Sequence, residues 1–129
     1  MYNYKLDFSR KYRITNTKDY REVYNHGKWF NSSLLDVSAK SNTLGFTRLG
    51  LSVSKAVGNA NERNLVKRRV RNLFISINNI NKGWDIVVIP KKESVKTNFQ
   101  SFRKIFLDSL LTLSIIPGCN LNSKDLNEK

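Results

Sequence analysis

Several residues that define common protein classes are scarce in this chain of 129 residues. The single cysteine, Cys119, allows no internal disulfide, which fits a reducing compartment. No apolar run approaches the roughly 20 residues of a membrane-spanning helix. The first residues, MYNYKLDFSRKYR, lack an apolar stretch followed by a small-residue cleavage site. We therefore expect a cytoplasmic protein that has no membrane partner.

Side chains suited to acid–base or metal chemistry are also few. His26 is the only histidine, and it stands beside Gly27 at the expected end of a helix, where a cap or surface role is expected. The ten Asp and Glu residues are scattered, with no pair at a metal-binding spacing, and Asp36 has the position of an ordinary surface residue on a strand. We expect no catalytic residue, no protein metal site and no protein-bound cofactor.

Positive charge, by contrast, is abundant. Twenty-three Lys and Arg residues against ten Asp and Glu give a net charge of +13 and a pI of about 10.1. Residues 55–72 hold six of the basic residues and one Glu, and residues 1–28 hold another seven with three acids. Because such an excess repels itself in the folded state, it points to a polyanionic partner. Without a basic helix backed by an exposed apolar face, nucleic acid is a better candidate than a membrane surface.

The length and the apolar content of 40% suit one globular domain, residues 1–129. Apolar periodicity predicts the order helix, two or three strands, helix, strand, helix. The segments expected are helices over 17–27, 60–77 and 97–113, and strands over 34–40, 48–54 and 85–90. A strand, a helix and another strand suggest a parallel pair inside a mixed sheet, hence an α+β or α/β fold. Residues 1–14 are expected to form a poorly ordered basic arm, and residues 117–129 a poorly ordered tail.

The basic segment GNANERNLVKRRVR, residues 58–71, is predicted to form an amphipathic helix that starts with a capping box of Asn59 and Glu62. At 100° per residue, one sector collects the apolar side chains Val66, Val70, Leu73, Phe74 and Ile77. A strip beside that sector, here called the basic strip, collects Arg63, Asn64, Lys67, Arg68 and Arg71. The apolar sector is expected to enter the core, which leaves the basic strip at the surface.

A basic strip is compatible with two roles. A solvated helix face is the commoner origin of a charge run. Solvated faces usually mix signs, however, because like charges four residues apart destabilise a helix. Arg side chains also suit phosphate oxygens, and the N–H groups of the helix N-terminus behind Gly58 add to them. We favour nucleic-acid binding, and we expect no DNA partner because a strand, not the first helix of a helix-turn-helix, precedes this helix.

The stretch RLGLSVSKAVGNANERNLVKRRVR, residues 48–71, resembles the signature of the bacterial ribonuclease P protein subunit. In that family a strand leads through a Gly into a helix with the pattern Arg-Asn-x-x-Lys-Arg-x-x-Arg, which the basic strip fills in register behind Lys55, Gly58 and Ala60. DYREVYNHG at 19–27 is similar to the family's first helix, and DIVVI to its last strand. Departures from the family pattern are Ala56, Glu62 and Leu65.

The resemblance implies an α+β fold of about four strands and three helices, similar to the second domain of ribosomal protein S5. It also implies an unusual left-handed β–α–β crossover around the basic helix. It further implies a subunit that binds the catalytic RNA of ribonuclease P through Lys55, Arg63, Asn64, Lys67, Arg68 and Arg71. The RNA subunit would bind most of the Mg²⁺ and perform the hydrolysis.

The resemblance also implies that the 5′ leader of precursor tRNA lies between the first helix and the sheet. The residues expected to bind it are Arg13, Tyr20, Tyr24, Ser52 and Ser54. Gly50, Ser52 and Ser54 would leave a low polar face of the sheet that a nucleotide backbone can approach; a face exposed only to solvent is the alternative. For the two tyrosines, core packing against the sheet is nearly as good an interpretation as stacking on bases. Two rival functions also remain: a ribosomal or other structural RNA-binding protein, and a nuclease that needs no RNA subunit.

Overall fold

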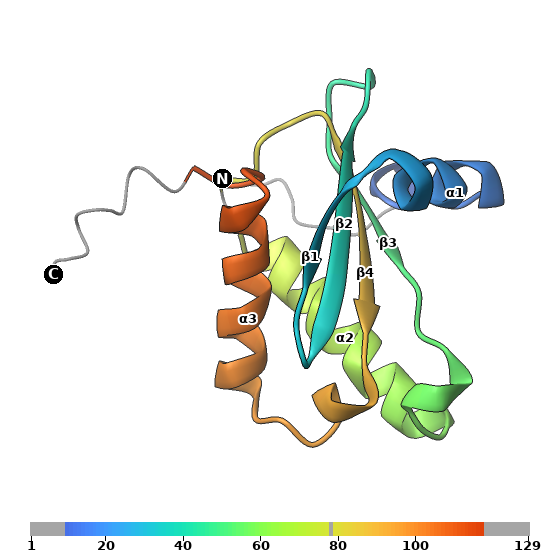
Figure 1. Ribbon diagram of the computed structural model, residues 1–129, viewed down its shortest axis with the longest axis vertical. Helices are drawn as coiled ribbons and strands as arrows, with labels where there is room; N and C mark the ends of the chain where they lie inside the picture. The colour runs from blue at the N-terminus through green and yellow to red at the C-terminus, as the bar shows by residue number, and fades with distance from the viewer. Residues whose placement is uncertain (1–9, 78, 118–129) are drawn as a thin grey trace, which may run out of the picture.

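A computed structural model describes residues 10–77 and 79–117 of the chain. In these residues four strands form one mixed sheet, and three α-helices lie on its two faces (Figure 1). In chain order the elements are η1 (Arg10–Tyr12), α1 (Thr17–His26), β1 (Lys28–Asn31), β2 (Leu35–Ser41), β3 (Arg48–Leu51), η2 (Lys55–Val57), α2 (Ala60–Ser76), β4 (Trp84–Pro90), η3 (Lys92–Ser94) and α3 (Phe99–Thr112). The α+β fold with about four strands and three helices is confirmed, and β1 is the strand that the periodicity did not define.

The sheet has the strand order β1-β2-β4-β3. The β1–β2 and β2–β4 pairs are antiparallel, whereas β3 and β4 are parallel and are connected through α2. This arrangement confirms the predicted parallel pair within a mixed sheet. The left-handedness of the crossover stays an expectation drawn from the family.

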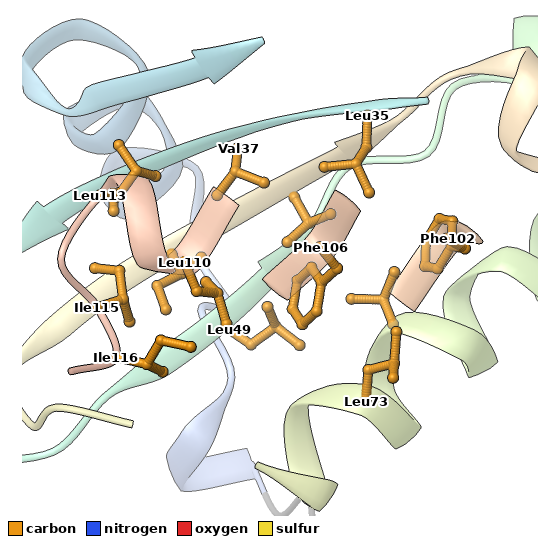
Figure 2. Packing of buried hydrophobic residues seen from close by; sticks show 14 residues of the cluster. Leu35, Val37, Leu49, Leu73, Phe102, Phe106, Leu110, Leu113, Ile115 and Ile116 are labelled. Atoms are coloured by element: carbon orange, nitrogen blue, oxygen red, sulfur yellow. The ribbon is translucent and has the colours of Figure 1, made fainter. Parts of the chain in front are cut away.

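The two faces of the sheet carry different cores. On one face, α2 and α3 pack over Leu35, Val37, Leu49, Ile86 and Val88, and Figure 2 shows Phe102, Phe106 and Leu110 of α3 directed into this cluster. On the other face, α1 places Val23 against Val87 together with Ile14. Figure 1 shows α1 and α3 on opposite sides of the sheet. The run DIVVI of β4 is apolar because both faces of this strand are covered.

Side chains fix where the helices begin. Asn16 and Asn98 accept hydrogen bonds from the backbone N–H groups of Asp19 and Ser101. Asn59 and Glu62 form the predicted capping box at the start of α2. Since Asn98 is the cap, α3 starts at Phe99 rather than at residue 97, and Phe99 in its first turn is 43% exposed.

The strand predicted over 48–54 ends at Leu51. Ser52 still donates its N–H to the carbonyl of Val88, at 3.0 Å. The next bond of a parallel ladder would need an N–H from residue 90, and Pro90 has none. The ladder therefore stops, and Ser54 leads into η2 instead of lying on a strand.

Part of the arm expected over 1–14 belongs to the folded domain. Residues 10–12 form η1, Arg13 forms a bridge with Leu49, and Ile14 is buried. Residues 1–9 of the arm, and residues 118–129 of the expected tail, lie outside the described residues. Within residues 10–77 and 79–117, no helix is long and apolar enough to cross a membrane.

Candidate RNA-binding surfaces

The basic strip lies along α2 as a continuous surface. Val66, Val70 and Leu73 are buried on the sheet side of the helix, while Asn64, Arg68 and Arg71 are exposed and Lys67 is partly exposed. Neither Lys67, Arg68 nor Arg71 forms an ion pair or a side-chain hydrogen bond within the described part of the chain. These cations therefore present unneutralised charge to solvent, in a row that suits a run of phosphates.

Two arginines of the same basic segment are engaged within the protein. Arg63 donates from Nη1 to the carbonyl of Gly58 at 2.9 Å, which leaves its other donors available. Arg69 donates from Nη1 to the carbonyls of Ser94 and Thr97, at 3.1 and 3.0 Å. Arg69 thus ties α2 to the segment before α3, and the sequence pattern did not separate it from its neighbours.

The second surface begins where α1 crosses the sheet. One register row runs across all four strands as Trp29, Ser38, Val87 and Gly50, here called the covered row. Ser38, Val87 and Gly50 of this row are buried beneath α1. Ser38 donates its hydroxyl to the carbonyl of Val23 at 2.9 Å, which holds the end of the helix against the sheet.

The next register row on the same face is more exposed, although its Ile89 still packs against the cluster that α1 covers. It consists of Asn31, Asp36, Ile89 and Ser52, here called the open row, and none of the four is buried. The Asp36 carboxylate lies 3.3 Å from Nζ of Lys91, so its negative charge is compensated. A mostly polar and mostly uncharged row beside the tyrosines of α1 suits the approach of a single-stranded nucleic acid.

Tyr20 and Tyr24 lie one turn apart on α1 and are both partly exposed. The Tyr20 ring covers Gly50, where an added Cβ would lie 2.8 Å from Cε1 of the ring. Its hydroxyl accepts from the N–H of Leu51 at 3.1 Å and lies 3.3 Å from the Leu51 carbonyl, to which it donates. Burial raises the pKa of Tyr20. The core-packing interpretation of Tyr20 is therefore confirmed in part, and its stacking on bases stays a prediction. Gly50 lies under the Tyr20 ring and does not offer the open surface expected from the sequence.

A third aromatic residue, Trp29, joins the two tyrosines. Its ring stacks on Tyr24 with a centroid distance of 6.1 Å and an interplanar angle of 17°, and the Tyr20 and Tyr24 centroids are 6.5 Å apart. Trp29 was absent from the residues expected at the site. The adjacent aromatics Trp29 and Phe30 directly after Gly27 are the signal that could have indicated a strand here, because aromatic residues are enriched in strands.

The remaining expected residues lie around these surfaces. Arg13 is exposed at the outer edge of β3, where it bridges Leu49. Ser54 and Lys55 are exposed at the start of η2, in the segment that runs from the open row to the N-terminus of α2. The expected residues therefore form two groups on different sides of the sheet, connected by residues 52–59.

No group of three or more His, Cys, Asp or Glu side chains suited to a metal ion occurs in the described ranges. Several of the acidic residues there serve structural contacts. Asp85 receives a bidentate pair of hydrogen bonds from Arg48, at 2.9 and 2.6 Å, and Arg48 also reaches Asp19 of α1 at 3.3 Å. The hydrogen bond with Asp85 raises the pKa of Arg48.

Comparison with known proteins gives the family of the chain. The family model described as ribonuclease P matches residues 8–113. The chain belongs to the bacterial ribonuclease P protein family. The ribonuclease P protein component of Clostridioides difficile is 36% identical over 101 residues, which cover 77% of this chain and 89% of that relative. The protein component of Helicobacter acinonychis is 33% identical over 121 residues, or 84% and 74% of the two chains.

Solved structures of the ribonuclease P family share the fold. The RNase P protein from Thermotoga maritima superposes with a TM-score of 0.69 at 32% identity, covering 82% of this chain and 98% of that one. The Staphylococcus aureus RNase P protein gives a TM-score of 0.74 at 28% identity, with coverages of 82% and 98%. The chain is thus a protein component of the ribonuclease P endoribonuclease, and this membership implies the ribonuclease P RNA as its partner.

Proposed function

We propose that this protein binds the catalytic RNA of ribonuclease P through α2 and the 5′ leader of precursor tRNA through the face beside α1. In this role it assists endonucleolytic removal of the leader in the cytoplasm, and the RNA subunit performs the hydrolysis with Mg²⁺. The observation that carries the proposal is the separation of the two groups of residues on a single domain: unneutralised cations on α2, and aromatics beside an open row of the sheet.

The α2 surface supports RNA binding through its charge and geometry. Arg68 and Arg71 are exposed and Lys67 is partly exposed, all without internal partners in the described residues, and Lys55 adds a further exposed cation at η2. Their helical spacing allows contact with successive phosphates, and each contact would release condensed counterions. Asn64, exposed within the same strip, supplies an amide that can both donate and accept.

The α1 face supports leader binding through stacking and polar contact. Tyr20 and Tyr24 border the open row, where bases can stack on rings while Ser52 meets the sugar–phosphate backbone. Arg13 and Ser54 extend this surface beyond β3 at the two ends of the strand. Because stacking uses the π-face that every base has, the leader would be bound with little dependence on its sequence.

The direct test is cleavage of precursor tRNA by the catalytic RNA at low Mg²⁺, with and without this protein. A subunit that neutralises phosphates lowers the Mg²⁺ needed for assembly and substrate binding, so we expect a clear stimulation of cleavage. No stimulation at any Mg²⁺ concentration would contradict the proposal. Cleavage by the protein stripped of RNA would instead support the rival nuclease function.

A further inference from the structure

We infer that Trp29 is a third base-stacking residue and lengthens the leader contact by one nucleotide at the β1 edge of the sheet. This inference rests on the proposed leader-binding function of the α1 face. Trp29 is one of three large apolar side chains exposed in the described part of the chain, and the only one of them beside α1, with 41% of its surface accessible.

The sheet register places Trp29 at the end of an aromatic series. Trp29 pairs with Ser38, Ser38 with Val87, and Val87 with Gly50, so all four point to the face that carries α1. Tyr20 covers Gly50 at the β3 edge, and Tyr24 stacks on Trp29 at the opposite edge. The three rings therefore follow α1 from one edge strand to the other, alongside the open row.

The contact geometry leaves Trp29 available for stacking. One face of its indole is covered by Tyr24, at an interplanar angle of 17°, and the described residues provide no other aromatic partner. A base added to the other face of the indole would continue the stack that Tyr24 and Trp29 form within the protein. A large π-surface of this kind binds an unpaired base by stacking and dispersion rather than by reading its hydrogen-bonding edge.

Charge favours RNA over a protein partner at this position. Lys28 is exposed next to Trp29 on β1, and the whole chain carries +13. The nearest acid of the open row, Asp36, is paired with Lys91. An apolar protein partner would gain no binding energy from this excess of positive charge. A leader that extends past Tyr24 instead meets both the ring of Trp29 and the charge of Lys28.

The experiment uses the full chain assembled with the catalytic RNA and a series of precursor tRNAs whose leaders grow by one nucleotide at a time. Affinity should rise with leader length and then level off. In Trp29→Ala the plateau should come one nucleotide earlier, with affinity for the longest leader reduced about fivefold or more, the size of one lost base–aromatic stack. Trp29→Phe should retain most of the wild-type affinity for the longest leader because it keeps an aromatic ring. Trp29→Leu keeps an apolar contact with Tyr24 but no ring, and should lose as much affinity as Trp29→Ala.

Phe99→Ala is the matched control, since Phe99 is an aromatic of similar exposure, 43%, on α3 across the sheet. It should leave the length profile unchanged. A second readout uses fluorescence: the chain has two tryptophans, so Trp84→Phe leaves Trp29 as the only tryptophan, to be excited at wavelengths that its tyrosines do not absorb. Precursor tRNA with a long leader should alter this emission, while mature tRNA should not.

An abasic nucleotide moved along the leader locates the contact. At one leader position the abasic nucleotide should lower the affinity of the wild-type protein but not that of Trp29→Ala. This result is expected if the base at that position and the Trp29 ring contact each other directly. Length profiles that coincide for wild type and Trp29→Ala, while the wild type still prefers substrates with a leader, would overturn the role of Trp29 alone. A wild-type protein with no preference for a leader would overturn the proposed leader site itself.

Discussion

Arg68 and Arg69 are neighbours in the chain, but α2 turns their side chains about 100° apart, so that they meet different surroundings. Arg68 is exposed, whereas Arg69 donates to the carbonyls of Ser94 and Thr97. A side chain that already satisfies two backbone groups contributes mainly to stability, and one without internal contacts is available to a ligand. Basic residues of one run are thus separable into binding and structural roles.

This difference gives a matched pair of variants. Arg69→Ala should lower the free energy of unfolding by about 2 kcal/mol, because two carbonyls lose their donor. Arg68→Ala should change it by less than about 0.5 kcal/mol, as for most surface substitutions, yet weaken binding of the catalytic RNA. Urea unfolding and filter binding measure the two quantities. Equal effects of both variants on stability would refute the assignment.

Tyr20 connects residue chemistry to pH. Burial raises its pKa above the ordinary 10.0, so the hydroxyl keeps its proton longer in the folded than in the unfolded protein. The resulting stabilisation is complete below pH 10 and is lost as the pH rises through the higher folded value. The free energy of unfolding should therefore fall above about pH 10, and Tyr20→Phe should reduce the slope of that fall. Identical slopes in urea titrations of the two proteins would argue against a buried, hydrogen-bonded hydroxyl.

At the scale of elements, α1 is held to the sheet at several points. Tyr20 is bonded to Leu51, Val23 accepts from Ser38, and Asp19 lies 3.3 Å from Arg48. Arg48 in turn forms the bidentate pair with the buried Asp85. The orientation of the aromatic edge of α1 beside the open row depends on these contacts, of which only Tyr20 is also expected to touch RNA.

Removing Arg48 tests this attachment. Arg48→Met should destabilise the protein by roughly 3 kcal/mol, because Asp85 is left without its cation in a buried position. Asp19→Asn should cost less than about 1 kcal/mol, since it weakens only the outer and more exposed contact. Thermal unfolding monitored by circular dichroism compares the two variants. A smaller loss for Arg48→Met than for Asp19→Asn would contradict the described network.

The start of α2 and its apolar stripe followed from the sequence because both are encoded locally. The Asn59–Glu62 pair marks the helix start by residue type and spacing, and the stripe of Val66, Val70 and Leu73 appears at a period of 3.6. The register of the basic strip was therefore predictable as well. Its role in RNA binding remains a prediction.

Features that depend on distant partners did not follow from the sequence. The end of β3 at Leu51 is set by the missing N–H of Pro90, which lies on another strand. The cover of Gly50 by Tyr20 and the stacking of Trp29 on Tyr24 both require the register of α1 on the sheet. Arg69 differs from Arg68 only through the position of the segment before α3.

At the scale of the whole molecule, the net charge of +13 is expected to act on RNA binding through the cations exposed on α2 rather than through its total. Arg68→Ala and Arg71→Ala should each reduce the slope of log K against log salt for catalytic-RNA binding by about one. Lys104→Ala removes the same charge from α3, where Lys104 pairs with Asp108, and should leave the slope nearly unchanged. Equal changes in all three variants would show that only the total charge matters.

Two separate surfaces of the protein are proposed to bind two different RNAs, and the substrate affinity of the assembled enzyme distinguishes their roles. The quantity to measure is the ratio of dissociation constants for mature tRNA and precursor tRNA, with the protein at concentrations that saturate the catalytic RNA. We expect Tyr24→Ala to bring this ratio towards one without weakening assembly, and Arg68→Ala to weaken assembly while leaving the ratio unchanged. If both variants lower the ratio equally, or if both weaken assembly equally, the separation of the two surfaces is contradicted.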